Sequence, residues 1–384
     1  MIIHVVLNSK LISCDSIIPV CMEIKSQKPH AVFMFYCESG SHKLAVMQNK
    51  TLHRAIISIG ELKAFGELGK ATKLNWFRRP IIISQVLSLI FCSIIKKSFF
   101  VHFRKLDYFP YSLIKSCHRN KTILFESSAK SVNSLLTKGY GRKPVQYRLD
   151  EPSIVGFSSF WFASLSAGSR QKHIQIPQSF LMPAWNNFLN AQAEALNIEN
   201  HWLALKSKDR PVVVIILGPL GALQLMREDA GMINCLRLTI KAVQSVAPDS
   251  LIVMKPHPVT DMNLLTDIIN EFNGANIEVE YFHPGLLAKF ADVVICNAFS
   301  TSMTDAHASG ATTVEFSDYS SDMLKLSKGL SVEPEYIDYF INRDFEKLSH
   351  LLRVLLGTKV PRLERRHLSP QDFKNITKFI ETLN

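Results

Sequence analysis

The sequence lacks the cysteine patterns of a zinc site or of a disulfide-rich protein. Its seven cysteines include no Cys-x-x-Cys pair and no cysteine–histidine spacing suited to zinc. Most of them lie inside apolar runs, so we expect buried, reduced thiols. The N-terminus has no basic region ahead of a hydrophobic stretch, so we expect no secretory signal peptide. These absences predict a cytoplasmic protein.

An apolar run long enough for a membrane span is also lacking. Residues 81–95 are uncharged and mostly apolar, but they number only 15 and include Gln85 and three serines. Crossing a bilayer takes about 20 apolar residues. We therefore predict a buried helix. The alternative is a helix at the inner face of the cytoplasmic membrane, with the basic pairs 78–79 and 96–97 on anionic lipid.

The usual phosphate-loop signatures are missing as well. The chain contains no GxxxxGK[ST] P-loop, and no GxGxxG fingerprint opens it, which argues against a dinucleotide-dependent oxidoreductase. Gly218-Pro219-Leu220-Gly221 follows an apolar run but matches neither spacing. Its glycines, Gly218 first, would still let the backbone approach a ligand closely.

The composition is that of a globular protein, and the charged residues are distributed unevenly along the chain. Of 384 residues, 47% are apolar and 20% are charged, which excludes a disordered chain and fits two domains. Residues 1–150 hold 23 basic and 8 acidic residues, whereas residues 151–384 hold 21 and 25. Only the first part should attract anions. A basic nucleic-acid-binding protein is a remote alternative, because no helix-turn-helix, RRM or KH signature is present.

Short apolar runs alternate with amphipathic stretches, which predicts an α/β protein with largely parallel sheets. We expect two Rossmann-like domains: an N-terminal acceptor-binding domain over 1–200, including a connecting segment, and a nucleotide-sugar domain over 208–332. A helical tail follows over 333–384. The predicted strands are 2–7, 31–36, 98–103, 122–127, 212–218, 250–258, 276–282, 292–298 and 312–316.

The strongest local signal is Lys255-Pro256-His257-Pro258 at the end of an apolar strand. The prolines deny the backbone a helix and fix the direction in which the histidine leaves the sheet. A cation beside an imidazole at the carboxyl end of a strand is suited to a phosphate. The alternative is a turn that merely contains a histidine.

A second signal is Ser300-Thr301-Ser302, directly before a predicted helix. Three hydroxyls at a helix N-terminus combine side-chain donors with free backbone N–H groups, which suits an anion. Ordinary N-capping explains the same residues. Because these residues and the Lys255–Pro258 segment follow strands of one predicted sheet, they can face one phosphate from two sides.

Residues 210–320 carry a family resemblance. The stretch KPHP followed by ADVVICNAFSTSMTDAHASGATTVEF resembles the C-terminal domain of bacterial GT-B glycosyltransferases of capsule and lipopolysaccharide assembly, the sialyl- and Kdo-transferases above all. CDP-glycerol glycerophosphotransferases share the outline, and the UDP-GlcNAc 2-epimerase fold shares it more loosely. The resemblance implies two domains facing each other across a cleft.

The resemblance also implies roles for individual residues. His257, Lys255 and Pro258 would hold the donor phosphate together with the hydroxyls and backbone of 300–302. Asp305 would bind the nucleotide ribose. Glu315 is a second ribose candidate, and a buried or capping carboxylate is the alternative for it. The base would be cradled after the third strand of this domain, by Tyr281, Phe282, His283 and Pro284.

The implied activity is transfer of a sugar from a nucleotide donor to a surface glycan or a lipid-linked acceptor. A CMP-linked acidic sugar is favoured over a UDP-sugar, and a CDP-glycerol-type phosphotransferase is the alternative. No Asp-x-Asp lies in a suitable loop, so we expect no metal and no other cofactor. An inverting transferase needs a base, for which Asp15 and Glu126 are the candidates in the basic first half.

Overall fold

The computed structural model divides the chain into two compact units, each described here by itself. Among the described residues, unit 1 comprises those up to 186 and those from 369 onward, and unit 2 comprises residues 187–357. The described residues are 1–7, 12–66, 78–96, 98–103, 109–117, 122–125, 153–156, 173–218, 231–258, 260–298, 300–357, 369–381 and 383.

Unit 1 is built on a seven-stranded parallel sheet with the strand order β3-β2-β1-β4-β5-β6-β7. The central strands are β-branched or aromatic, and they are buried as such residues should be. The strands are β1 (Ile2–Leu7), β2 (Val32–Cys37), β3 (Gly60–Ala64), β4 (Phe99–Phe103), β5 (Thr122–Phe125), β6 (Ser153–Gly156) and β7 (His173–Gln175). The helices are α1 (Ile12–Gln27), α2 (Gly40–Gln48), α3 (Lys50–Ile59), α4 (Arg78–Lys96), α5 (Ser112–Cys117), the 3₁₀ helix η3 (Ser179–Leu181) and α17 (Pro370–Glu381).

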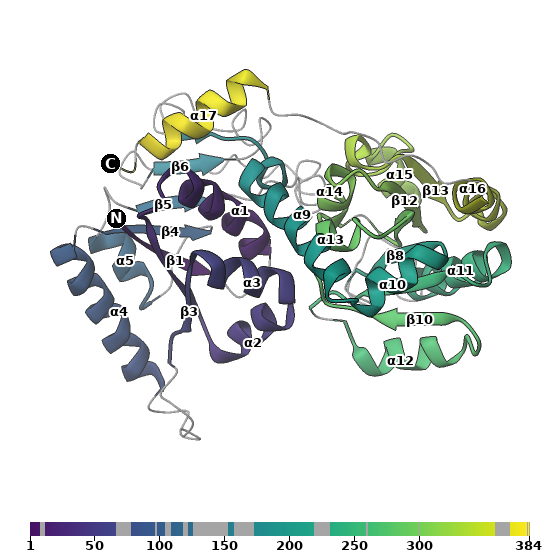
Figure 1. Ribbon diagram of the computed structural model, residues 1–384, viewed down its shortest axis with the longest axis horizontal. Coiled ribbons are helices and arrows are strands. Elements are labelled where there is room, and N and C mark those ends of the chain that lie inside the picture. Colours follow the sequence, from purple (N-terminus) through teal and green to yellow (C-terminus); the bar gives the residue numbers. More distant parts are fainter. Residues whose placement is uncertain are drawn as a thin grey trace. The chain divides into compact units, whose positions relative to one another are not determined.

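Helices α1 and α3 pack against each other in unit 1, and α4 packs with α5 (Figure 1). Val86 and Ile90 of α4 and Ile114 of α5 form one core cluster with Val6 of β1 and Phe100 of β4. All five side chains are buried. This cluster attaches one side of α4 to the sheet.

Unit 2 is built on a six-stranded parallel sheet with the order β10-β9-β8-β11-β12-β13. Helix α9 (Pro183–Ile198) contains the point at which the chain passes into this unit. The strands are β8 (Val212–Ile216), β9 (Leu251–Lys255), β10 (Asn276–Val279), β11 (Val293–Cys296), β12 (Thr312–Ser317) and β13 (Tyr339–Asn342). The helices are α10 (Trp202–Asp209), α11 (Gly231–Val246), α12 (Met262–Asn270), α13 (Pro284–Leu287), α14 (Ser302–Ala308), α15 (Ser321–Leu326), the 3₁₀ helix η4 (Pro334–Tyr336) and α16 (Phe345–Gly357).

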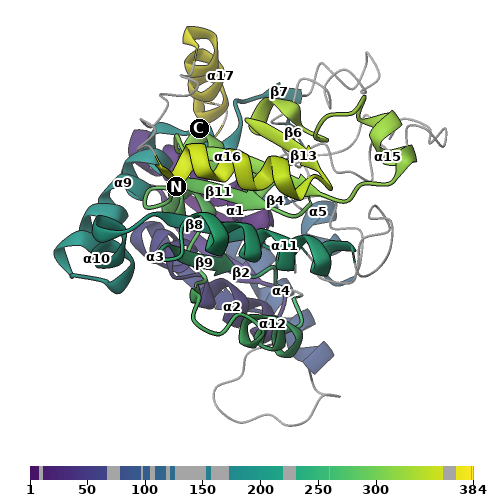
Figure 2. The ribbon, with the colours of Figure 1, turned by 90° about the vertical axis from the view of Figure 1, so that its right-hand side faces the viewer.

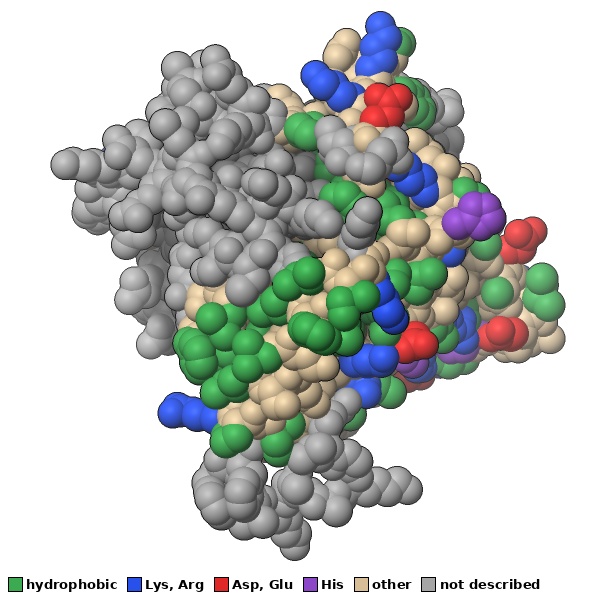
Figure 3. Space-filling view, turned by 90° about the vertical axis from the view of Figure 1, so that its left-hand side faces the viewer, with side chains coloured by type: hydrophobic (Ala, Val, Ile, Leu, Met, Phe, Trp, Pro, Cys, Tyr) green, Lys and Arg blue, Asp and Glu red, His purple; other side chains and the backbone are tan. Residues whose placement is uncertain are grey.

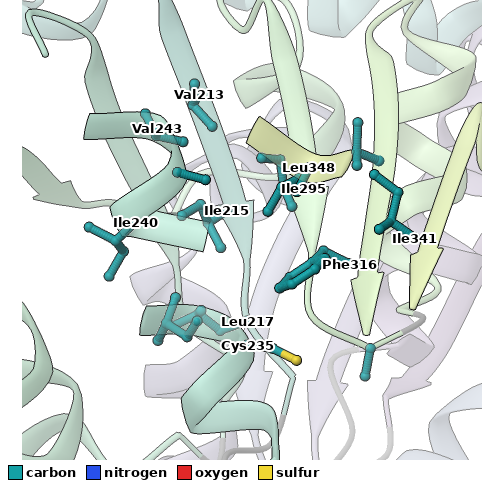
Figure 4. Close-up of a cluster of buried hydrophobic side chains, with 14 of the residues drawn as sticks. Val213, Ile215, Leu217, Cys235, Ile240, Val243, Ile295, Phe316, Ile341 and Leu348 are labelled. Carbon is teal, nitrogen blue, oxygen red and sulfur yellow. The ribbon is translucent and has the colours of Figure 1, made fainter. Parts of the chain in front are cut away.

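The core of unit 2 lies between its sheet and helices α11, α12 and α16 (Figures 2 and 4). Val213 and Ile215 of β8 meet Ile240 and Val243 of α11, and Leu348 comes from α16. Every residue of β8 is buried, as expected for a central strand of a parallel sheet. This buried core thus supports the segments that follow the carboxyl ends of the strands of unit 2.

The predicted α/β class and the nine predicted strands are confirmed, with ends shifted by a few residues. Four strands were missed. β3 is an edge strand in which exposed and half-buried residues alternate, β6 and β7 lie in the part of the predicted N-terminal domain for which no strand was predicted, and β13 lies in the predicted helical tail, 333–384. These strands are short, and pairing with a neighbour rather than local propensity makes them strands.

Candidate functional site

The sheet of unit 2 has a topological switch point between β8 and β11. These strands are neighbours, but the chain continues from β8 to β9 on one side and from β11 to β12 on the other. Ligands of open α/β sheets bind outside the carboxyl ends of the strands at such a point. Gly218 follows β8 there, and Ser300 follows β11. Both predicted residues therefore lie at the edge where a ligand is expected.

The turn after β9 holds the predicted phosphate ligands in a fixed shape. Lys255 ends β9, and its main-chain oxygen accepts a hydrogen bond from the N–H of Leu217, 3.0 Å away. The N–H of His257 donates to Oγ1 of Thr260 at 3.0 Å, and the N–H of Thr260 donates to the main-chain oxygen of His257 at 2.9 Å. This reciprocal pair closes the turn and holds the backbone of His257 in place.

The surroundings of His257 favour the neutral form of its ring. Partial burial is the main cause of a lowered pKa, and the positive charge of Lys255 lowers the pKa further. A neutral imidazole offers one N–H donor, and Lys255 supplies the charge that an oxyanion requires. Pro258 is exposed directly after the histidine. Lys255 and His257 are therefore suited to bind a negatively charged ligand.

The turn after β11 presents three half-exposed hydroxyl side chains. Oγ of Ser300 accepts a hydrogen bond from the N–H of Ser302 at 3.4 Å, so this hydroxyl takes part in local capping. Thr301 stands at the N-cap of α14 with an αR backbone, and its side chain makes no capping hydrogen bond. The capping alternative thus accounts for Ser300 and not for Thr301.

His283 and Pro284, predicted to cradle a base, lie inside unit 2. The side chain of His283 is 0% exposed, and its Nδ1 accepts a hydrogen bond from the N–H of Gly285 at 3.1 Å, which caps α13. Its Nε2 lies 3.8 Å from Oδ1 of Asp305. Since a fully enclosed ring offers a ligand no surface, His283 is not placed to contact a base. Pro284 is buried in the first turn of α13.

Of the two predicted ribose ligands, Asp305 lies in the first turn of α14 and retains a little exposed surface. Glu315 is 0% exposed. Its carboxylate accepts hydrogen bonds from the hydroxyls of Ser317 at 2.9 Å and Ser331 at 2.5 Å. These partners identify Glu315 as a buried structural carboxylate and leave Asp305 as the better candidate.

Sequence reasoning missed two residues that shape this edge. Thr260 closes the His257 turn, and the signal was a hydroxyl three residues after the histidine. Asn297 follows β11 and is buried. Its Nδ2 donates to Oγ1 of Thr239 at 2.8 Å and to the main-chain oxygen of Phe316 at 3.2 Å. It therefore ties the turn after β11 to α11 and β12.

In unit 1 the switch point lies between β1 and β4. Asp15 is half-buried in the first turn of α1, the helix that follows β1, rather than in a loop. Glu126 lies outside the described residues, as does Lys97 of the basic pair 96–97. The described residues of the chain include no group of three or more His, Cys, Asp or Glu side chains that could hold a metal ion.

Unit 1 also has a groove of about 550 Å³ between α4 and strands β1 to β3, which the sequence did not predict. Tyr36 and His4 lie in its floor, with the Tyr36 hydroxyl 3.5 Å from Nδ1 of His4. Burial, and to a smaller degree the charge of Glu61, raises the pKa of Tyr36 to about 12. Lys96 of α4 also lines the groove.

No protein-family model matches the chain, and no curated protein matches it. Solved structures do. UDP-GlcNAc 2-epimerase from Methanocaldococcus jannaschii aligns with 100% of both chains at a TM-score of 0.57 and 11% identity. The enzyme of the same name from Neisseria meningitidis, bound to UDP-GlcNAc, aligns with 100% of this chain and 99% of its own at 0.57 and 11%. Arabidopsis thaliana UGT89C1 complexed with UDP aligns with 99% and 100% at 0.53 and 9%.

These likenesses extend over both units and concern the fold. Two parallel sheets with flanking helices, in two Rossmann-like domains, form the GT-B architecture of these neighbours. The predicted fold class is confirmed.

Proposed function

We propose that the protein is a glycosyltransferase that uses a nucleotide-activated sugar as donor. The observation that carries this proposal is the pairing of Lys255 and His257 in a closed turn beside the β8–β11 switch point. Glycosyl transfer places negative charge on the leaving phosphate as the glycosidic bond to it breaks. Groups that are already oriented toward that charge lower the barrier most.

In this mechanism Lys255 supplies a positive charge to the leaving phosphate, and the neutral ring of His257 donates a hydrogen bond. Thr301 and the backbone at the start of α14 supply further donors, and Gly218 lets the main chain come close. Asp305 binds the ribose. These protein groups stabilise the leaving phosphate without a metal ion, and no other cofactor takes part.

The donor we propose first is a CMP-linked acidic sugar, such as Kdo or another ulosonic acid. A UDP-sugar is the second class, and it is supported by the UDP and UDP-GlcNAc bound in the neighbouring structures. The acceptor is a bacterial surface glycan or a lipid-linked glycan. We assign its binding to unit 1, because the excess of basic residues lies in residues 1–150 of the chain. Asp15 or Glu126 takes the proton of the acceptor hydroxyl.

A panel of CMP, CDP, UDP and GDP in a thermal-shift assay tests the donor. A nucleotide that binds only the folded chain stabilises it by about 2.7 kcal/mol when present at 100 times its Kd. We expect CMP to raise Tm most. UDP raising Tm most would reassign the donor to a UDP-sugar, and no response to any nucleotide would contradict the proposal.

The second candidate is a sugar-nucleotide 2-epimerase, favoured by the TM-scores of 0.57 to two such enzymes. It is separated by incubating the protein with UDP-GlcNAc alone. A transferase needs an acceptor and leaves the sugar unchanged at C2, whereas an epimerase inverts C2 without one. NMR of the sugar ring distinguishes the two outcomes.

A further inference from the structure

The side of α4 that points away from the core of unit 1 is apolar. Leu87, Phe91, Ile94 and Ile95 are all exposed, with 65% of Phe91 accessible. Their spacing of four, seven and eight residues from Leu87 places them on one face of the helix. Figure 3 looks onto this side of unit 1 and shows the hydrophobic side chains gathered there in a continuous patch.

The opposite face of α4 is the one that packs. Val86, Leu89 and Ile90 are at most 8% exposed and belong to the core cluster with β1 and β4. The surface helix of a globular protein normally turns polar side chains outward once its apolar stripe is buried. Here Ser84 and Ser88 line the groove beside the helix, while large apolar side chains face outward. This helix therefore has two apolar faces, and only one of them is covered among the described residues.

The charges of α4 indicate what covers the other face. Arg79 and Lys96 are exposed near its two ends, and residues 78–97 contain four basic residues and no acidic one. A second copy of this helix would bring like charges together, which opposes self-association. An anionic lipid bilayer has an apolar interior below negatively charged headgroups. It therefore matches both the apolar patch and the basic residues at the ends of α4.

The attachment of α4 to unit 1 determines how it can meet a bilayer. The segment Arg79–Lys96 has a mean hydropathy of 1.6 and is long and apolar enough to cross a membrane, although 22% of it is buried. To cross a bilayer, however, the helix would have to leave the core formed by Val86, Leu89 and Ile90. A helix that stays packed on one side can instead lie in the plane of the interface.

We propose that unit 1 docks onto anionic membranes through the outward face of α4, with Leu87, Phe91, Ile94 and Ile95 immersed below the headgroups and Arg79 and Lys96 among them. The docking is independent of the donor site, which lies in unit 2. It places unit 1 at the membrane surface with α4 in the plane of the interface.

Vesicle co-sedimentation of the full chain tests the apolar contact. The wild type should bind vesicles of phosphatidylcholine and phosphatidylglycerol, and the triple variant L87Q/F91Q/I95Q should bind at least about tenfold less. The matched control is L44Q/M47Q/I57Q, which changes three exposed apolar residues of α2 and α3 in the same unit and should bind within about twofold of wild type. Unchanged Tm and nucleotide binding would show that each variant is folded.

The charged contact has its own variant, R79Q/K96Q. It should lose about tenfold of its binding to the anionic vesicles and little to pure phosphatidylcholine, since each basic residue contributes separately at the surface. Raising salt from about 0.01 M to about 0.15 M should weaken the wild type in the same direction. The proposal fails if wild type does not bind anionic vesicles at low salt, or if the control triple loses as much as the α4 triple. It also fails if light scattering shows a dimer that F91Q dissociates.

Discussion

His257 combines three properties that suit it to bind a phosphate. It follows a buried strand, its N–H is held by Thr260, and its ring is kept neutral by burial and by Lys255. A phosphate in front of it would receive a hydrogen bond from the ring and charge from the lysine. These properties make His257 the first residue to test in the proposed donor site.

Replacement of His257 by alanine should lower kcat/KM by about 10²-fold, because one preorganised donor to the leaving phosphate is lost. Tm should change little, since the ring is only partly buried. Initial rates and Tm measured on the same preparation check this. His350→Ala, an exposed histidine of α16, is the matched control and should keep full activity. Near-normal activity of a folded His257→Ala variant would remove His257 from the site.

His42 of α2 should make the stability of the fold depend on pH. Burial lowers its pKa from 6.5 to about 4, so the folded chain holds the ring neutral. As pH falls below about 6.5 the unfolded chain binds a proton and the folded chain does not. The free energy of unfolding should therefore decrease by about 2 kcal/mol between pH 7 and pH 4 on account of this residue.

Urea unfolding of wild type and His42→Leu at several pH values measures this contribution. The variant should lose less stability than wild type as the solution is acidified, and the two curves should become parallel above pH 7. A difference between them that does not vary with pH would show that His42 does not titrate as its burial predicts.

Among the elements, the turn between β9 and α12 shows how a short segment positions a functional group. The prolines fix its direction, Thr260 closes it, and Asp261 caps α12 by accepting hydrogen bonds from the N–H groups of Asn263 and Leu264. Each contact is local in sequence, yet the turn is useful only because β9 lies beside β8 in the sheet.

Thr260→Val should lower kcat/KM by about tenfold, because the N–H of His257 loses its acceptor and the turn loosens. Thr260→Ser keeps the hydroxyl and should restore most of the activity. Thr260 acts through His257, so the Thr260→Val change should be much smaller in a His257→Ala background. Equal effects in both backgrounds would assign Thr260 to general stability.

At the scale of the whole molecule, the two units have different chemical characters. Each has its own parallel sheet and its own switch point. The predicted donor residues follow strands of unit 2, whereas the basic excess and the outward apolar face of α4 belong to the first part of the chain. The proposed transfer from a soluble donor to a membrane-bound acceptor would use this division of roles.

Activity should survive an excess of EDTA, because in the proposed mechanism Lys255, His257 and backbone donors stabilise the leaving phosphate without a metal ion. The measurement is the initial rate with and without chelator, on the donor that the nucleotide panel identifies. A complete loss that Mg²⁺ or Mn²⁺ restores would mean that the donor site uses a metal ion, and the mechanism proposed above would then be wrong.

The sequence by itself determined the α/β class, the central strands and the segments that follow them, since continuous β-branched runs and strand-end prolines and glycines are local signals. Only the tertiary structure decided which of those residues face outward: His283 and Glu315 are enclosed, while Lys255, His257 and Thr301 keep accessible surface. The tertiary structure also showed that one side of the helix over residues 81–95 is exposed. The sequence could not show this, because a helix with two apolar faces has the same apolar composition as a fully buried helix. Burial depends on which neighbours the fold brings to each face, and no local pattern contains that information.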